Sequence, residues 1–325
     1  THTHEIFRLG IRKLLPEQVE LISGPGCPVC VTQVGFIDEA IYLALERQVT
    51  ICTFGDLVRV PGTNMSLAGA REKGAKIRIV YSPVDAKEYA KEHPKEQVTF
   101  LSVGFETTTP SACLSVKKAR EEGLTNYSIL TANKTMPQAY EALKGSADIF
   151  LYPGHVNAIT GTKLCEELAK EGVSGVVAGF TAKELLTALA VALARFQEGR
   201  PFFANCYPRV VTENGSPQAQ KLVEEMMEPC DSEWRGLGVI KGSGMRLQEE
   251  WSAFDARKKY KIPPIQGKAN PACRCGDVLQ GKCKPSDCKV FGKVCTPQHP
   301  IGACMVSGEG ACSAYYMYGE AEEMK

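Results

Sequence analysis

The chain has 325 residues and a formal net charge of +1, from 38 basic and 37 acidic side chains. This balance, without a dense basic run, argues against a nucleic-acid partner. A chain of this length is expected to form two or three domains. Hydrophobic residues make up 44% of the chain, which allows a substantial core. The longest apolar stretch is interrupted by Lys183 and Glu184, which favours a buried helix over a membrane span. We therefore expect no membrane partner, and no secretory signal peptide is visible.

The cysteines are numerous and unevenly spread. Seven of the fourteen lie between Cys273 and Cys312. Secreted disulfide scaffolds are short and rich in loops, whereas this chain is long and rich in helical patterns. Clustered cysteines in the cytoplasm serve metal binding or redox chemistry more often than structural bridging. We therefore expect a cytoplasmic protein with a metal or redox site.

Short β-branched runs alternate with amphipathic helical stretches over the first 210 residues. The predicted strands are VELIS (19–23), VTICTF (49–54), AKIRIVY (75–81), VTFLSVGF (98–105), YSILTA (127–132), DIFLY (148–152), VSGVVAGF (173–180) and CYPRVV (206–211). The predicted helices are Gly35–Gln48, Asp85–His93, Ser111–Glu122, Pro137–Leu143, Thr162–Glu171 and Ala182–Gln197. Such alternation is typical of βαβ units and parallel sheets.

Eight strands over this length fit two domains better than one large sheet. The polar segment Lys91–Gln97 contains a proline and predicts the boundary. Residues 1–94, completed by about 206–262, would form the first domain, and 95–205 the second. From Pro263 the chain is rich in Gly, Pro and Cys, so residues 263–325 need a metal or covalent staple to fold. We expect an α/β fold with two similar parallel-sheet domains facing a central cleft, and a small cysteine-rich domain.

Four loops that follow predicted strands carry unusual residues for ordinary turns: GPGCPVC, CTFGDLVRVPG, GFETTTP and YPGHVNAI. Parallel strands end at a common edge of the sheet, where ligand sites form. The four loops together predict one composite site, although any single loop also fits a plain βα turn. Its candidate residues are Cys27, Cys30, Cys52, Glu106 and His155.

Cys27 and Cys30 frame a C-x2-C motif ahead of a predicted helix. The start of a helix offers unpaired N–H groups and the positive end of the helix dipole, which favour a thiolate. From the residues alone, a redox pair, a metal site and a turn with incidental sulfur all stay open. Cys52, on the next predicted strand, offers a third sulfur to the same place.

The other candidates in these loops each allow two interpretations. His155 fits a ligand or proton donor, and equally a structural histidine. Glu106 fits a base or a group that orients a ligand. Asp56 and Arg59 are predicted to form an ion pair that shapes the cleft.

The cysteines of the C-terminal segment follow a C-x14-C-x6-C-x16-C spacing from Cys273 through Cys288 and Cys295 to Cys312. Structural zinc sites favour paired C-x2-C knuckles, and bacterial ferredoxins a more compact spacing. Four thiolates from separate loops suit a cubane cluster, but zinc and disulfides stay open on spacing alone. The remaining cysteines of this segment are Cys275, Cys283 and Cys304.

These motifs together resemble the HypD family of [NiFe]-hydrogenase maturation factors. The resemblance is carried by GPGCPVC, TFGDLVRVPG, GFETTTP, PGHVNAI, EWRGLGVIKGSG, FDA and DCKVFGKVCTPQHPIGACMVSGEGACSAYY. It runs from THTHEIFRLGIRKLLP to near Tyr318, which is almost the whole chain. The motifs are long, so the resemblance is specific.

The resemblance implies a [4Fe–4S] cluster in the C-terminal segment. Its ligands fall on Cys273, Cys288, Cys295 and Cys312. It also implies a redox thiol pair beside the cluster, falling on Cys275 and Cys304, while Cys283 receives no role.

The resemblance further implies assembly of an Fe(CN)2CO fragment, with iron bound transiently in the cleft. Cys30 is then the iron ligand, with Cys27 and Cys52 as supporting or relay thiols. Soft thiolates suit low-spin iron(II) with cyanide and CO ligands. The implied partners are a HypC-type small chaperone and a HypE-type cyanide donor protein, and the chain by itself is expected to be monomeric.

Our leading hypothesis is a maturation scaffold with redox activity rather than a conventional turnover enzyme. The alternative is a stand-alone iron–sulfur thiol–disulfide reductase, which needs only the cysteines and a substrate groove. A nucleotide-dependent enzyme is disfavoured, since neither G-x-x-x-x-G-K-[ST] nor G-x-G-x-x-G occurs in the chain.

Overall fold

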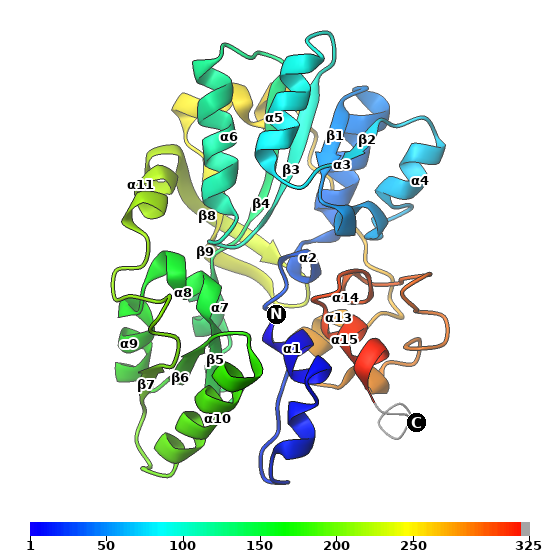
Figure 1. Cartoon of the computed structure of the whole chain (residues 1–325). Coiled ribbons are helices and arrows are strands. Elements are labelled where there is room, and N and C mark those ends of the chain that lie inside the picture. The colour runs from blue at the N-terminus through cyan, green and yellow to red at the C-terminus, as the bar shows by residue number, and fades with distance from the viewer. Residues whose placement is uncertain (320–325) are drawn as a thin grey trace.

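The computed structural model in Figure 1 describes residues 1–319. It holds one four-stranded sheet, one three-stranded sheet and one two-stranded antiparallel hairpin. The strands of the two larger sheets are parallel throughout, which confirms the predicted α/β fold. Within the described residues, no helix combines the length and hydropathy needed to cross a membrane.

The first sheet has the strand order β2-β1-β3-β4 and lies at the top of Figure 1. Its strands are β1 (Thr50–Thr53), β2 (Ile77–Ile79), β3 (Val98–Gly104) and β4 (Tyr127–Asn133). Every residue of β3 and β4 is buried, as expected for central parallel strands covered by helices on both faces. The helices around this sheet are α3 (Val34–Glu46), α4 (Leu67–Glu72), α5 (Pro83–Glu92) and α6 (Thr109–Glu121), with a short 3-10 helix η2 (Gly55–Arg59).

The second sheet has the order β5-β6-β7 and lies at the lower left of Figure 1. Its strands are β5 (Ile149–Pro153), β6 (Ser174–Ala178) and β7 (Phe203–Asn205). Its helices are α7 (Met136–Ala142), α8 (Gly154–Thr160), α9 (Lys163–Lys170) and α10 (Ala182–Phe196). Helix α10 begins with a capping box, in which Thr181 and Glu184 satisfy each other's backbone N–H groups.

Two predicted strands and one predicted boundary differ from the structure. Residues 19–23 form no strand, and the last strand of the second sheet is β7 rather than 206–211. Strand β3, which follows the segment 91–97, pairs with β1, which precedes it. The change from one sheet to the next therefore falls between Asn133 and Ile149, because hydrogen bonding across β1 and β3 continues the first sheet past 91–97.

A hairpin that the sequence analysis missed connects the second sheet back to the first. It consists of β8 (Met227–Trp234) and β9 (Gly238–Leu247), and it follows helix α11 (Pro217–Met226). Strand β9 packs against β4, and a single bridge joins Lys134 to Gly244. The chain continues through η3 (Glu249–Phe254) and α12 (Ala256–Tyr260), which also contact β4.

The N-terminal and C-terminal segments pack together beside the two sheets. The N-terminal elements are α1 (His2–Arg8), η1 (Ile11–Leu14) and α2 (Pro28–Val31). The C-terminal ones are α13 (Cys275–Leu279), η4 (Pro285–Asp287), α14 (Ala303–Val306) and α15 (Ala311–Tyr318). Phe7 of α1 stacks edge-on against Tyr315 of α15, with ring centroids 4.6 Å apart, inside one shared core. The expected separate C-terminal domain is not confirmed, because this core takes residues from both ends of the chain.

Arg257 joins α12 to both α3 and the first sheet. Its guanidinium donates to Glu39 of α3 at 2.7 Å and to the Thr131 carbonyl of β4 at 2.9 Å. Replacement Arg257→Ala leaves the half-buried Glu39 carboxylate and a backbone carbonyl unpaired. We expect it to lower the free energy of unfolding by about 2 kcal/mol, measured by urea denaturation.

The matched control is Arg246→Ala, which removes an exposed ion pair to Glu228 on the hairpin. Exposed pairs contribute little, so the urea midpoint should stay unchanged. Equal midpoints for the two variants would contradict the assigned role of Arg257.

Candidate functional site

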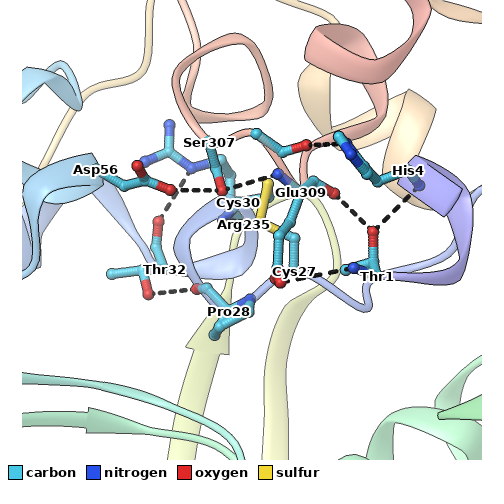
Figure 2. Close-up of a disulfide and its surroundings, with 11 residues drawn as sticks. Thr1, His4, Cys27, Pro28, Cys30, Thr32, Asp56, Arg235, Ser307 and Glu309 are labelled. Carbon is cyan, nitrogen blue, oxygen red and sulfur yellow. Dashed lines mark hydrogen bonds and ion pairs between the residues drawn. A yellow bond between two sulfur atoms is a disulfide. The ribbon is translucent and has the colours of Figure 1, made fainter. Parts of the chain in front are cut away.

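Cys27 and Cys30 form a disulfide at the start of helix α2 (Figure 2). Cys27 caps the helix, and its Sγ accepts a hydrogen bond from the backbone N–H of Cys30 at 3.2 Å. Pro28 occupies the first helical position, where the backbone N–H that proline lacks would have no partner within the helix. The two cysteines are 3% and 0% exposed, so the bridge is shielded from water. The sequence left open whether they pair, and the structure pairs them.

The C-terminal segment closes over this disulfide (Figure 2). Ser307, just after α14, donates its hydroxyl to Asp56 Oδ2 at 2.9 Å, and the backbone N–H of Glu309 donates to the same hydroxyl. The expected Asp56–Arg59 ion pair is not among the contacts of the described chain. Arg59 instead donates to the Pro297 carbonyl at 2.6 Å. Both side chains therefore hold the first α/β unit to the C-terminal segment.

The end of the β8–β9 hairpin contacts the other side of α2. The backbone N–H of Arg235 donates to the Val31 carbonyl at 2.8 Å, and its Nε donates to the Thr32 carbonyl at 3.0 Å. Trp234 is fully buried and stacks on Phe105, with ring centroids 5.9 Å apart. The sequence motif EWRGLG, which had no role by its chemistry alone, thus completes the surroundings of the disulfide.

Glu106 follows β3 and turns its carboxyl group into the interior. Oε1 accepts a hydrogen bond from the Met136 N–H at 2.8 Å, and Oε2 is buried without a partner among the described residues. Burial raises the pKa of Glu106 from its ordinary 4.5 to about 7. A carboxyl group with a pKa raised towards neutrality suits a group that gives or takes a proton.

Sequence reasoning missed a buried polar group next to Glu106. The hydroxyls of Tyr140 and Tyr152 are buried and unpaired within residues 1–319, and their rings meet edge-on at 4.8 Å. Cys165, held by Asn157 at 3.2 Å, lies near both tyrosines. Tyrosine and cysteine at apolar positions are typical of an ordinary core, so no signal in the sequence distinguishes them.

His155 lies at the start of α8, after β5, and is exposed. Its ring stacks on Phe180 at 4.2 Å, and His2 stacks on the same phenylalanine at 4.5 Å. His2 Nε2 lies within hydrogen-bond distance of the carbonyls of Ala178 and Gly179. Burial lowers the pKa of His2 to about 4, so its ring is neutral. His155 is therefore connected to the N-terminal helix, a link that the sequence analysis did not foresee.

Cys52 lies apart from the Cys27–Cys30 disulfide. It lies within β1, fully buried in a core cluster with Val80, Phe100 and Cys113. The Cys27–Cys30 disulfide belongs to a different cluster. Burial raises the pKa of the Cys52 thiol to about 12, which disfavours the reactive thiolate.

Six cysteines of the C-terminal segment line one pocket. Apolar side chains, among them Val278, Phe291 and Met305, complete its wall. The lining cysteines are Cys273, Cys275, Cys288, Cys295, Cys304 and Cys312. The structure thus brings together all four residues predicted as cluster ligands and both predicted redox thiols.

Cys283 is the exception in this segment. It lines a separate pocket with Arg12, Glu20 and Lys284. In the described part of the chain, no three His, Cys, Asp or Glu side chains form a group that could hold a single metal ion.

The predicted thiol pair is in contact. The neighbouring thiols of Cys273 and Cys304 hold the pKa of Cys275 well below its ordinary value. Helix α14, which carries Cys304, packs directly against α2, which carries Cys30. Cys275, Cys304 and the disulfide accordingly share one hydrophobic cluster. The two cysteine sites are neighbours in the fold although they come from opposite ends of the chain.

Comparison with known proteins supports the resemblance found in the motifs. Residues 1–319 match the HypD family model, described as the hydrogenase formation hypA family. The hydrogenase maturation factor HypD of Cupriavidus necator is 41% identical over 99% of this chain and 89% of its own length. The HypD proteins of Rhizobium leguminosarum and Escherichia coli are 43% and 42% identical, each over 99% of this chain and 87% and 88% of their own lengths. The chain therefore belongs to the HypD family of hydrogenase maturation factors.

Proposed function

We propose that this protein assembles the Fe(CN)2CO fragment of [NiFe]-hydrogenase, holding iron at its cleft cysteines and supplying electrons through thiols. The observation that carries this proposal is the packing of α14 against α2, which puts a thiol pair beside a disulfide. Such an arrangement suits reduction of the disulfide on demand, which frees thiolates for a soft metal.

The six-cysteine pocket supports the proposal of a [4Fe–4S] cluster. A cubane binds each thiolate through a different iron, so its four ligands surround a volume and need not converge on one point. Cys273, Cys288, Cys295 and Cys312 all line the pocket, and its apolar wall would shield a cluster from water. A cluster held there would supply single electrons to keep Cys275 and Cys304 reduced.

The thiols act on the disulfide by exchange. Cys304 or Cys275 attacks the Cys27–Cys30 bond and forms a mixed disulfide, and the second thiol of the pair resolves it. The Cys27–Cys30 bond breaks as the mixed disulfide forms, and the mixed disulfide breaks as the Cys275–Cys304 bond forms. Two electrons move to Cys27 and Cys30, and the two protons that leave the attacking thiols balance those that the new thiols gain.

Reduced Cys30 is then the proposed ligand of the incoming iron, with Cys27 beside it. Glu106 is placed to exchange a proton as thiols and thiolates interconvert, since its pKa lies near neutrality. His155 is exposed and thus accessible to a HypC-type chaperone or a HypE-type cyanide donor, the partners that this role requires.

The cluster assignment predicts a sharp division among the C-terminal cysteines. Replacement of Cys288 or Cys295 by Ala should prevent the protein from holding four irons after anaerobic reconstitution with iron and sulfide. Cys283→Ala is the matched control, because Cys283 lines a different pocket, and it should retain the cluster. The measurement is iron and sulfide content with visible absorption, and an intact cluster in Cys288→Ala would contradict the assignment.

The assembly role is tested by infrared spectroscopy of the protein purified with its HypC-type partner. We expect bands from iron-bound cyanide and CO, and their loss in Cys30→Ser. Cys206→Ser, a partly exposed cysteine outside the disulfide cluster, should leave the bands in place. An absence of bands in the unmodified protein with an intact cluster would favour the stand-alone reductase.

The buried carboxyl of Glu106 predicts a pH-dependent stability. Its pKa is higher in the folded chain, about 7, than the ordinary 4.5. Its contribution to stability is therefore fully present below pH 4.5 and lost as the pH rises through about 7. Glu106→Gln carries no ionisable group there, so it should gain about 2.5 kcal/mol relative to the unmodified protein between pH 5 and pH 8.

Urea denaturation at the two pH values measures this difference. Glu17→Gln, at an exposed position, serves as the control and should follow the unmodified protein at both. A constant difference between Glu106→Gln and the unmodified protein would show that the carboxyl titrates as an ordinary one.

A further inference from the structure

The turn between β8 and β9 touches both cysteine sites. This turn, Arg235–Leu237, joins the last residue of β8 to the first residue of β9. On one side Arg235 donates two hydrogen bonds to the end of α2, to the carbonyls of Val31 and Thr32. These carbonyls follow Cys30 directly, so the turn fixes the helix that carries the disulfide.

On its other side the turn meets helix α13, which begins at Cys275. The backbones of Gly236 and Gly276 are in direct contact, and a Cβ on Gly236 would lie 2.2 Å from the Gly276 Cα. Gln280, at the end of α13, donates its side-chain amide to the Gly236 carbonyl at 2.5 Å. The turn thus contacts the residue next to Cys275 through backbone atoms, at a separation that leaves no room for a Cβ on either glycine.

The base of the turn is rigid. Trp234 is fully buried, and its Nε1 donates to Ser243 Oγ at 2.7 Å. Lys134, at the end of β4, is also fully buried and donates to the Ser232 hydroxyl and the Glu233 carbonyl. The hairpin is therefore anchored on the first sheet and presents its turn from a fixed base.

We propose that the turn Arg235–Leu237 is the positioning element that holds α13 against α2, so that the Cys275–Cys304 pair reaches the Cys27–Cys30 disulfide. The inference rests on the proposed function, since it assumes that electrons pass between these two pairs. Exchange requires the attacking sulfur to meet the disulfide along a narrow approach. Small shifts of a reacting group carry large losses in rate.

The chain offers a matched pair of substitutions to test this. Gly236 and Gly238 both have left-handed backbone, with φ of +82° and +76°. A Cβ on Gly236 collides with α13, whereas one on Gly238 meets nothing within 4 Å. Gly236→Ala and Gly238→Ala therefore introduce similar backbone strain in the same hairpin, but only the first displaces α13.

The experiment uses the full chain with a reconstituted cluster under anaerobic conditions. Dithionite supplies electrons, and mass spectrometry of alkylated peptides follows the opening of the Cys27–Cys30 bond. We expect Gly236→Ala to open the bond about tenfold more slowly than the unmodified protein, and Gly238→Ala to match the unmodified protein. Direct reduction by a phosphine, which bypasses the cluster, should proceed at equal rates in all three.

Four outcomes would contradict the proposals. Slower opening in Gly236→Ala with both reductants, or equal opening with dithionite in both glycine variants, overturns the positioning role. Cys275→Ser should abolish opening by dithionite, and rapid opening in that variant overturns the proposed function itself. If Gly236→Ala does not fold, Gln280→Ala replaces it, because it removes the hydrogen bond to the Gly236 carbonyl without straining the backbone. It should then slow the dithionite reaction alone, and an unchanged rate counts against the turn.

Discussion

The packing of helix α14 against helix α2 is the contact on which the candidate site depends. Each helix has four residues, far fewer than a helix needs to be stable by itself in water. Their shape is therefore a product of tertiary contacts, such as the bond from Ser307 to Asp56. The disulfide and the thiol pair each have a defined position only because the two ends of the chain fold against one another.

The parallel sheets were predictable because burial on both faces leaves a clear signal. The sequences of strands such as β3 and β4 are continuous apolar or β-branched runs, and helical patterns lie on either side of them. The hairpin was missed because β8 carries Pro229 and charged residues, and its burial alternates along the strand. Residues 19–23 share that mixed character but have no neighbouring strand in the fold, so pattern alone could not separate the two.

The part of the candidate site that could be predicted from the sequence is the set of cysteines in the C-terminal segment, because their spacing and motifs are distinctive. The cysteines predicted as cluster ligands and the predicted Cys275–Cys304 pair line one pocket. The position of Cys52 could not be predicted, because its place on a strand does not determine which face of the sheet its side chain takes. Cys52 packs with Val80 and Phe100 in a core cluster that does not include the disulfide. His2 gave no signal, because its contacts are a stacked ring and two backbone carbonyls that only the fold supplies.

A backbone turn has a physical advantage as the link between the disulfide and the Cys275–Cys304 pair. Side-chain contacts allow rotamer changes, whereas the Gly236–Gly276 contact leaves no atom that can rotate away. The base of the turn is anchored, because Trp234 is buried and donates a hydrogen bond to Ser243. The turn can therefore position helices α2 and α13 relative to the first sheet. Glycine at position 236 is required twice, by its positive φ and by the space that α13 occupies. The hairpin that the sequence analysis missed is thus the part of the fold best placed to set the distance between the disulfide and the Cys275–Cys304 pair.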